Sequence, residues 1–337
     1  MTDYYVDPTA TGADTGATWA NAWTTLQRAI DGTDGTKPGA GDTVYCKANG
    51  TTADETLSAA IDMDGTSGNS TSGYVRFIGV NSSGVNDGTR YLINANSKSV
   101  GIYCLGNYKW LENFEIYGSG GAGIDWTNQY FDFWIMKNVV SRDNTGVGFD
   151  LYYSGYAPCW FIECRAYNND GDGFSNPYRG TIDFIHCVSH SNGGKGFQGP
   201  FAEPPFTHWI GCLAYENTGD NYSRARGTIY QSVSDGSTSG DGVEIINSPT
   251  VIIGSRITNN NTYGISIGDL CVKQFCYLGG NGTDENGSLG YNLLHKGAST
   301  VTTEGTDTDH GYNDPTNDDY SLTSDATYRR AAIDLVQ

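Results

Sequence analysis

Basic residues are scarce in this chain of 337 residues. Lys and Arg together number 19 against 38 Asp and Glu, which gives a formal net charge of −19. An acidic chain of this kind repels nucleic acid and anionic membrane surfaces, so we expect neither as a partner. A polyanionic substrate would need a bound cation or a well-placed arginine to offset the same repulsion.

Long apolar runs are absent as well. No window approaches the roughly eighteen apolar residues of a membrane-spanning helix, so we expect no membrane insertion. The N-terminal stretch MTDYYVDPTA has neither a basic region nor an apolar core. We therefore expect a protein made in the cytoplasm without a signal peptide, and the alternative is a secreted protein.

Spacings typical of metal, nucleotide and esterase sites are also missing. The eight cysteines and five histidines show no zinc-ligand spacing. We find no phosphate-binding loop, no dinucleotide-binding glycine motif before a helix, and no nucleophile elbow. Proline is rare, at 9 residues, whereas glycine is common, at 46, which favours many tight turns over Pro-rich linkers.

The chain does contain an internal repeat. A glycine followed by an apolar residue recurs at steps of 22, 25, 25 and 23 residues, skips one degenerate copy near Asn221, and resumes. A second run in each period alternates apolar and polar residues, which is strand periodicity. The pattern predicts an all-β protein, a right-handed parallel β-helix that forms a single-stranded solenoid with 22–25 residues per coil. The repeating glycines are Gly101, Gly123, Gly148, Gly173, Gly196, Gly242 and Gly264.

The repeat also predicts which residues stack on neighbouring coils. Cys164, Cys187 and Cys212 occupy one phase and should form an inward column of free thiols, about 4.8 Å apart. Three residues further along in each coil, a second set should stack outward. This set consists of Tyr167, His190 and Tyr215.

Outside the repeat the chain divides into three parts. Residues 1–40 are predicted to form an N-terminal cap with a helix over about 18–31, whose apolar stripe covers the first coil. Residues 41–300 should form the β-helix. Residues 301–337 should form an extended tail or cap that packs on the solenoid or on a neighbouring subunit.

Through this repeat, the chain resembles the broad family of right-handed β-helix repeat proteins. That family includes polysaccharide lyases, surface proteins, and phage structural and tailspike-like proteins. The stretch 148–201 is similar in part to the pectate lyases of polysaccharide lyase family nine. That resemblance implies calcium bound by aspartates and a lysine base that removes a proton next to a uronate carboxylate.

Carried over residue by residue, the resemblance points to Asp150, Asp170 and Asp172 as calcium ligands. Gln198 stands where the family has its lysine, and an amide cannot act as a base. Lys195 is then the candidate catalytic base for a lyase, with Asp150 and Asp172, and the alternative is an ion pair between Lys195 and Asp172.

Two other interpretations of these residues stay open. The segment NNDGDGF is first of all explained by a corner of the β-helix, in which Gly171 and Gly173 allow positive φ or close packing. Asp125 and Asp150, at one phase of adjacent coils, form a carboxylate pair that would suit glycoside hydrolysis.

Two segments that are longer than a coil needs are rich in aromatic side chains. These could stack on sugar rings, contact another subunit, or belong to the core. The candidates for glycan or subunit contact are Tyr152, Tyr153, Tyr156, Trp160, Phe201, Phe206 and Trp209.

Short coils and the missing lysine lead us to expect a non-enzymatic protein. The predicted function is a phage virion surface protein (capsid decoration, spike or tail component), assembled as a homotrimer with other virion subunits and requiring no cofactor. The alternative is a calcium-dependent polysaccharide lyase or another polysaccharide-degrading enzyme. A bacterial surface adhesin is the third.

Overall fold

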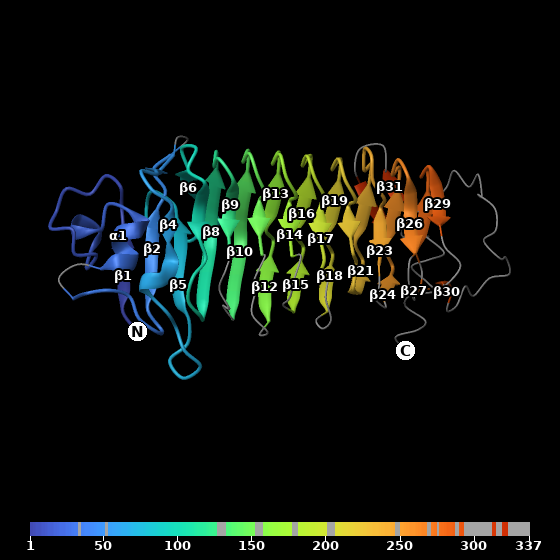
Figure 1. Ribbon diagram of the computed structural model, residues 1–337. Coiled ribbons are helices and arrows are strands. Elements are labelled where there is room, and N and C mark those ends of the chain that lie inside the picture. Colours follow the sequence, from blue (N-terminus) through green and yellow to red (C-terminus); the bar gives the residue numbers. More distant parts are fainter. Residues whose placement is uncertain are drawn as a thin grey trace.

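The computed structural model shows a long β-solenoid with the N-terminal elements at one end (Figure 1). It describes residues 1–32, 35–50, 53–126, 133–151, 158–176, 181–200, 206–246, 250–267, 271–274, 276–286, 290–292, 312–314 and 319–322. Strands of successive coils pair in parallel, so the predicted right-handed parallel β-helix is confirmed.

A repeating coil contributes three short strands, and these stack into two sheets within the described part of the chain. The twenty-stranded sheet bends at a corner into two flanks, and the ten-stranded sheet closes the third side. The first flank holds β1 (Asp3–Val6), β2 (Thr43–Lys47), β5 (Val75–Val80), β8 (Lys109–Tyr117), β10 (Trp134–Arg142), β12 (Cys159–Ile162), β15 (Ile182–Ile185), β18 (Thr207–Ile210), β21 (Gly227–Tyr230), β24 (Thr250–Ile253), β27 (Cys271–Gln274) and β30 (Gly290–Asn292).

The second flank continues from the ends of β8 and β10. Its other strands are β3 (Glu55–Thr56), β6 (Tyr91–Asn94), β13 (Arg165–Tyr167), β16 (Val188–His190), β19 (Leu213–Tyr215), β22 (Val233–Asp235), β25 (Arg256–Thr258) and β28 (Tyr277–Gly279). The ten-stranded sheet consists of β4 (Ile61–Asp62), β7 (Val100–Tyr103), β9 (Ala122–Asp125), β11 (Phe149–Asp150), β14 (Phe174–Ser175), β17 (Phe197–Gln198), β20 (Tyr222–Ser223), β23 (Val243–Ile245), β26 (Tyr263–Ile267) and β29 (Thr283–Asn286).

The N-terminal region departs from the prediction in one respect. Instead of one helix over 18–31, there is a 3-10 turn, η1 (Trp19–Asn21), followed by a short α-helix, α1 (Leu26–Asp31). The side chain of Thr25 accepts the backbone N–H of Arg28 and caps α1, so the β-branched residue begins a new helix. The region also supplies β1, which pairs with β2, so it extends the solenoid as well as covering its end. A second 3-10 turn, η2 (Met63–Gly65), follows β4.

The far end of the chain contributes little to the described structure. Of residues 301–337, the structure describes β31 (Tyr312–Asp314) and β32 (Asp319–Leu322), which pair antiparallel. Where this tail packs stays a prediction. In the described residues no helix has both the length and the apolar composition needed to cross a membrane.

The interior is built from columns of like side chains. Rings of Phe149, Phe174, Phe197 and Tyr222 stack face to face, with centroids 4.5, 4.9 and 5.3 Å apart. The predicted inward column of free cysteines is confirmed, because Cys164, Cys187 and Cys212 are all buried. The thiol of Cys187 donates to the carbonyl of Phe161 at 3.2 Å, and burial holds its pKa well above the usual range, so it stays protonated.

The outward stack is also confirmed. The rings of Tyr167 and His190 lie 5.0 Å apart, and those of His190 and Tyr215 lie 4.7 Å apart, with nearly parallel planes. All three side chains are half-buried because each ring covers the faces of its neighbours.

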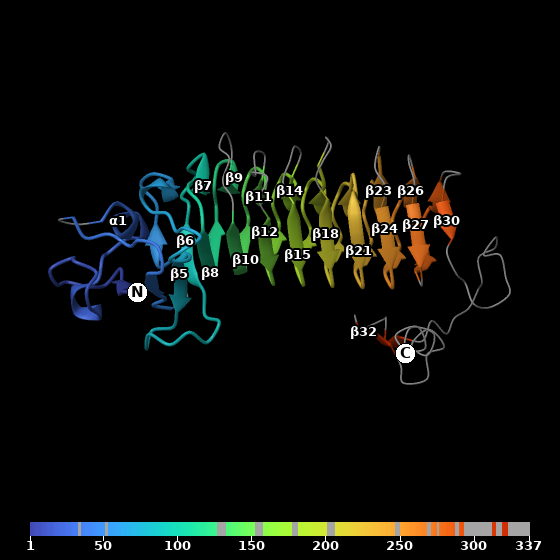
Figure 2. The ribbon, with the colours of Figure 1, turned by 90° about the horizontal axis from the view of Figure 1, so that it is seen from below.

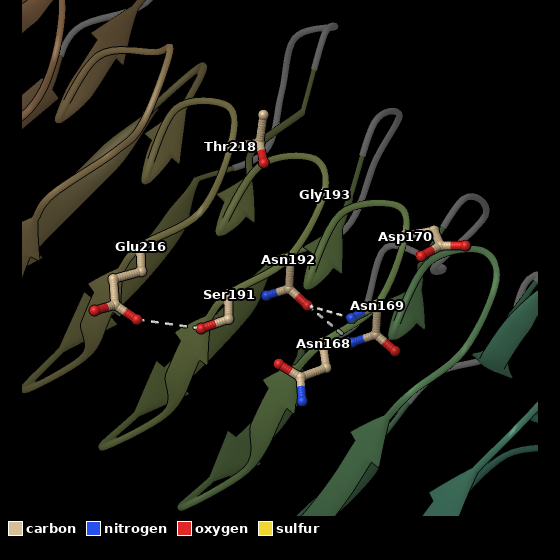
Figure 3. A pocket seen from close by; sticks show the side chains of 8 residues that line it. All are labelled: Asn168, Asn169, Asp170, Ser191, Asn192, Gly193, Glu216 and Thr218. Carbon is tan, nitrogen blue, oxygen red and sulfur yellow. Dashed lines mark hydrogen bonds between the residues drawn. The ribbon is translucent and has the colours of Figure 1, made fainter.

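A buried asparagine ladder holds the corner between the second flank and the ten-stranded sheet. It consists of Asn144, Asn169, Asn192 and Asn217, and the Nδ2 of each of the first three donates to the Oδ1 of the next at 2.8 to 2.9 Å. Figure 3 shows the link between Asn169 and Asn192. The Oδ1 atoms of Asn169, Asn192 and Asn217 also accept the backbone N–H of the asparagine one coil earlier. The repeated asparagines therefore form hydrogen bonds with buried backbone groups. From the sequence, these asparagines were expected only to lie in turns.

Gly173→Ala should lower the free energy of unfolding by about 1–3 kcal/mol, because overpacking forces neighbours apart. A Cβ at Gly173 would collide with Ser189 Oγ and lie 2.9 Å from both Asn192 Nδ2 and the carbonyl of Gly196. Urea unfolding measures the loss. The control is Gly39→Ala, whose Cβ would meet nothing closer than 3.8 Å; a similar loss in both variants would contradict the packing explanation.

Candidate functional site

The outer face of the ten-stranded sheet carries several of the charged and polar residues singled out from the sequence. Two parallel columns of side chains run along it. We call the first the strand column, and register pairs its members coil by coil: Asp125, Asp150, Ser175, Gln198, Ser223, Glu244 and Ser266. We call the second the turn column, and its members lie three residues earlier in their coils: Asp172, Lys195, Asp220, Asp241 and Tyr263.

The part of the strand column nearest the lyase-like segment is largely covered. Asp125, Ser175 and Gln198 are buried, whereas Asp150 is half-buried. Ser175 Oγ donates to Gln198 Oε1 at 3.0 Å. The predicted adjacency of Asp125 and Asp150 is confirmed by their register, while a role for this pair in glycoside hydrolysis stays a prediction.

Asp172 and Lys195 adjoin in the turn column. The backbone N–H of Lys195 donates to Asp172 Oδ1 at 2.7 Å. Burial raises the pKa of Asp172, and the Lys195 backbone bond and charge offset part of that rise. Lys195 is thus placed between two carboxylates, because its charge also acts on the pKa of Asp220.

Asp170 takes a different position from its predicted partners. It is exposed on the corner and lines an open groove of about 450 Å³ together with Asn168, Ser191 and Glu216 (Figure 3). Across the described residues, no group of three His, Cys, Asp or Glu side chains is arranged to hold a metal ion. Asp150, Asp170 and Asp172 therefore do not form the predicted calcium site, and no step below depends on calcium.

The structure gathers a group of carboxylates that the sequence interpretation missed. Asp220, Asp241 and Glu244 come from adjacent coils, and we call them the acidic cluster. Ser223 Oγ donates to Glu244 Oε2 at 2.6 Å, and the backbone N–H of Asp241 donates to Asp220 Oδ1 at 2.8 Å. The sequence did contain evidence for this cluster, because Asp220 and Asp241 occupy the same position in their coils as Asp172 and Lys195. The irregular coil near Asn221 made that shared position hard to recognise.

Burial and mutual repulsion raise the pKa values of two members of the acidic cluster, Asp220 and Asp241. Burial, followed by the charge of Asp220, raises the pKa of Asp241 to about 6. Burial also raises the pKa of Asp220, with the charge of Glu244 adding to the rise. Among the described carboxyl groups, Asp241 is therefore suited to exchange a proton at mildly acidic pH.

The raised pKa of Asp241 predicts how the free energy of unfolding depends on pH. The pKa of Asp241 is higher in the folded chain than the ordinary 3.8, so folding takes up a proton between about pH 4 and 6. The free energy of unfolding should therefore fall as pH rises through that window. Asp241→Asn should add about 1 kcal/mol at about pH 8, allowing for screening by solvent, and almost nothing at about pH 4.

Urea unfolding of both proteins at the two pH values measures this difference. Asp170→Asn, on the exposed corner, is the control. A gain from Asp241→Asn that is equal at both pH values would contradict the raised pKa.

The aromatic candidates separate into three groups. Trp209 is fully buried and stacks against Phe184 in the core, so its prediction as a contact residue is wrong. It belongs to β18, where strand alternation turns it inward. Trp160 is half-buried on the outer face of β12, and Phe206 is 45% exposed, with the Arg226 guanidinium 5.5 Å from its ring centroid. Tyr152, Tyr153, Tyr156 and Phe201 lie outside the described residues.

Comparison with known proteins supports the β-helix fold of the chain. No family model and no curated protein matches the chain. Among solved structures, the pectate lyase Pel9A is 15% identical with a TM-score of 0.60, over 97% of this chain and 90% of that one. A pectin methylesterase from Aspergillus niger is 12% identical with a TM-score of 0.46, over 87% and 90%. At these identities the likeness shows the fold, a β-helix of the type seen in a polysaccharide lyase.

The comparison corrects the predicted function. The chain matches a pectate lyase over nearly its whole length, which contradicts a non-enzymatic virion surface protein. The prediction relied on short coils that leave little chain for cleft walls. The structure shows that short coils still place ionisable groups of several turns side by side.

Proposed function

We propose that this protein is an enzyme that degrades a polysaccharide, with the acidic cluster as its proton-transfer centre. The observation that carries the proposal is the meeting of Asp220, Asp241 and Glu244 on adjacent coils, with the pKa of Asp241 raised to about 6. The match to a pectate lyase over nearly the whole chain supports the choice of substrate class.

Neighbouring carboxyl groups suit cleavage of a glycosidic bond. Asp241, protonated near pH 6, would donate its proton to the leaving oxygen of the bond. A neighbouring carboxylate, Asp220 or Glu244, would act on the anomeric carbon or on a water molecule. Ser223 holds one Glu244 oxygen in place through its 2.6 Å hydrogen bond.

Elimination is the second candidate reaction, and one observation favours it. Lys195 lies between Asp172 and Asp220, where its charge acts on both carboxylates. A lyase needs a base and a group that neutralises the uronate carboxylate. Gln198 cannot serve as that base, so elimination would depend on Lys195.

Incubation of the purified protein with neutral and acidic polysaccharides tests the proposal. Reducing ends and unsaturated products are followed in parallel at about pH 6. Since the net charge of −19 repels polyuronates, we expect new reducing ends on a neutral polymer without unsaturated products. Unsaturated products would assign the lyase reaction instead, and an intact panel would overturn the proposal.

A further inference from the structure

The outer face of the first flank carries an apolar column that the solenoid core does not use. Register aligns Ile162, Ile185, Ile210, Tyr230 and Ile253 on five successive coils. Each lies next to an inward residue of its own strand, such as Phe161, Phe184 or Trp209, which is buried. Tyr230 is 39% exposed, and the four isoleucines are half-buried because neighbours about 4.8 Å away cover their sides. An outward sheet face would ordinarily be polar.

A second column runs beside the first on the same strands. Its members are Ile135, Trp160, Asp183, His208, Thr228 and Val251. We call the two columns together the isoleucine face, and Figure 2 shows its strands β12, β15, β18, β21 and β24 side by side. The first column continues through Lys137, one coil before Ile162.

Charge argues that a second copy of this chain covers the face. The chain carries a net charge of −19, so most of its surface repels a second copy. The charged side chains of the two columns are Asp183 and His208, which give a formal charge of −1 with histidine neutral. Lys137, next to the first column, forms an ion pair with Glu112 at 3.1 Å and adds no net charge. This face therefore carries little of the chain's negative charge, and two copies can approach there with the least repulsion if Asp183 of one is kept away from Asp183 of the other.

The order of residues selects one orientation. Asp183 and His208 occupy the third and fourth of the six coils of their column, at its centre. We propose that two copies of the protein associate through the isoleucine face about a two-fold axis that runs along the strands. That axis reverses the coil order, so Asp183 of each copy faces His208 of the other. A two-fold axis along the solenoid would keep the coil order and leave each Asp183 level with the same coil of the other copy, away from its His208.

The size of the face sets the strength of the association. Six strands about 4.8 Å apart, each about 13 Å long, give a footprint of roughly 300 Å² per copy. Stable interfaces bury about 800 Å² per partner, so the dimer should be weak, with a Kd of order micromolar to tens of micromolar. The homotrimer expected from the sequence stays untested, and a single flat face favours a pair.

Sedimentation equilibrium of the full chain from about 1 to 200 µM tests the proposal. We expect a monomer–dimer equilibrium, and at least a tenfold higher Kd for the double variant Ile185→Thr with Ile210→Thr. Threonine keeps the β-branch, and unchanged circular dichroism and unfolding midpoints confirm folding. The matched control is Val188→Thr with Leu213→Thr on the second flank, which should leave the Kd unchanged.

A charge exchange tests the orientation. His208→Asp alone should raise the Kd at least tenfold, because two carboxylates then face each other, and adding Asp183→His should restore it. A wild-type monomer at every concentration would overturn the proposal and indicate that another part of the chain covers the face. A dimer unaffected by the threonine variant would overturn it as well.

Discussion

Asp241→Asn should lower the rate of polysaccharide cleavage by about 10²–10⁴-fold at pH 6 while leaving the protein folded. The amide keeps the size of the side chain, and its oxygen can still accept the backbone N–H of Tyr263 at 3.1 Å. What it loses is the proton that a carboxyl with a pKa of about 6 can donate. The loss should therefore appear in kcat more than in KM.

The pH profile supplies a second, independent readout. If protonated Asp241 is required, the activity of the natural chain should fall about tenfold per pH unit above about 6. That alkaline limb should disappear from whatever activity Asp241→Asn retains. Measurement of initial rates from about pH 4 to 8 on the substrate found in the panel checks both effects.

Asp170→Asn is the matched control for the activity prediction. It makes the same chemical change at an exposed corner, outside the acidic cluster. Its activity should stay within about twofold of the natural chain. An Asp241→Asn protein that cleaves at the normal rate would remove Asp241 from the mechanism, even if the protein proves to be an enzyme. Combined with the expected gain in stability at pH 8, a loss of activity would mark a site where function is maintained against stability.

Asn192→Ala should lower the free energy of unfolding by about 3–5 kcal/mol. Asn192 is 1% exposed, and its Oδ1 accepts from the backbone N–H and Nδ2 of Asn169 at 3.2 and 2.9 Å. Its Nδ2 donates to Ala166, Ser189 and Asn217 at 2.9 to 3.2 Å. Alanine leaves these groups without their partner in the interior, where each unsatisfied group costs about 1–3 kcal/mol.

Urea unfolding followed by circular dichroism measures the loss. Thr218→Ala is the control, since Thr218 is exposed on the same corner one coil further, and it should change stability by less than about 0.5 kcal/mol. A loss below about 1 kcal/mol for Asn192→Ala would show that the ladder follows from the fold and does not stabilise it.

Periodicity made the columns predictable. In a parallel solenoid each coil sits in register on the last, so residues one period apart must stack. This is why the inward cysteines and the outward stack of Tyr167, His190 and Tyr215 could be identified from spacing alone. Spacing did not place Trp209, because it stands at the end of a segment that is longer than a coil needs. Its inward direction follows from the register of β18 with β15.

The spacing of the repeat did not reveal the acidic cluster, because the coil that carries it is irregular. Between Asn217 and Asn260 the ladder position is held by Ser237, whose side chain is too short to bridge two coils. Asn221 takes over, accepting from Asn217 at 2.9 Å and donating to Asn260 at 3.0 Å. The coil there is short, so the spacing that reveals Asp220 and Asp241 is displaced in the sequence while the side chains still meet in space.

The amino-acid sequence by itself determined the β-helix, the direction of its strands and the identity of its stacked columns. It did so because inward and outward residues recur at the same positions of every coil. Only the tertiary structure decided the backbone conformation at the corners and the pKa values of the acidic cluster. Glu163 and His186 adopt positive φ, at 57° and 53°, at costs that only the stacked sheets on either side can offset. Likewise, the pKa of Asp241 depends on burial and on carboxylates from other coils, which no local segment contains.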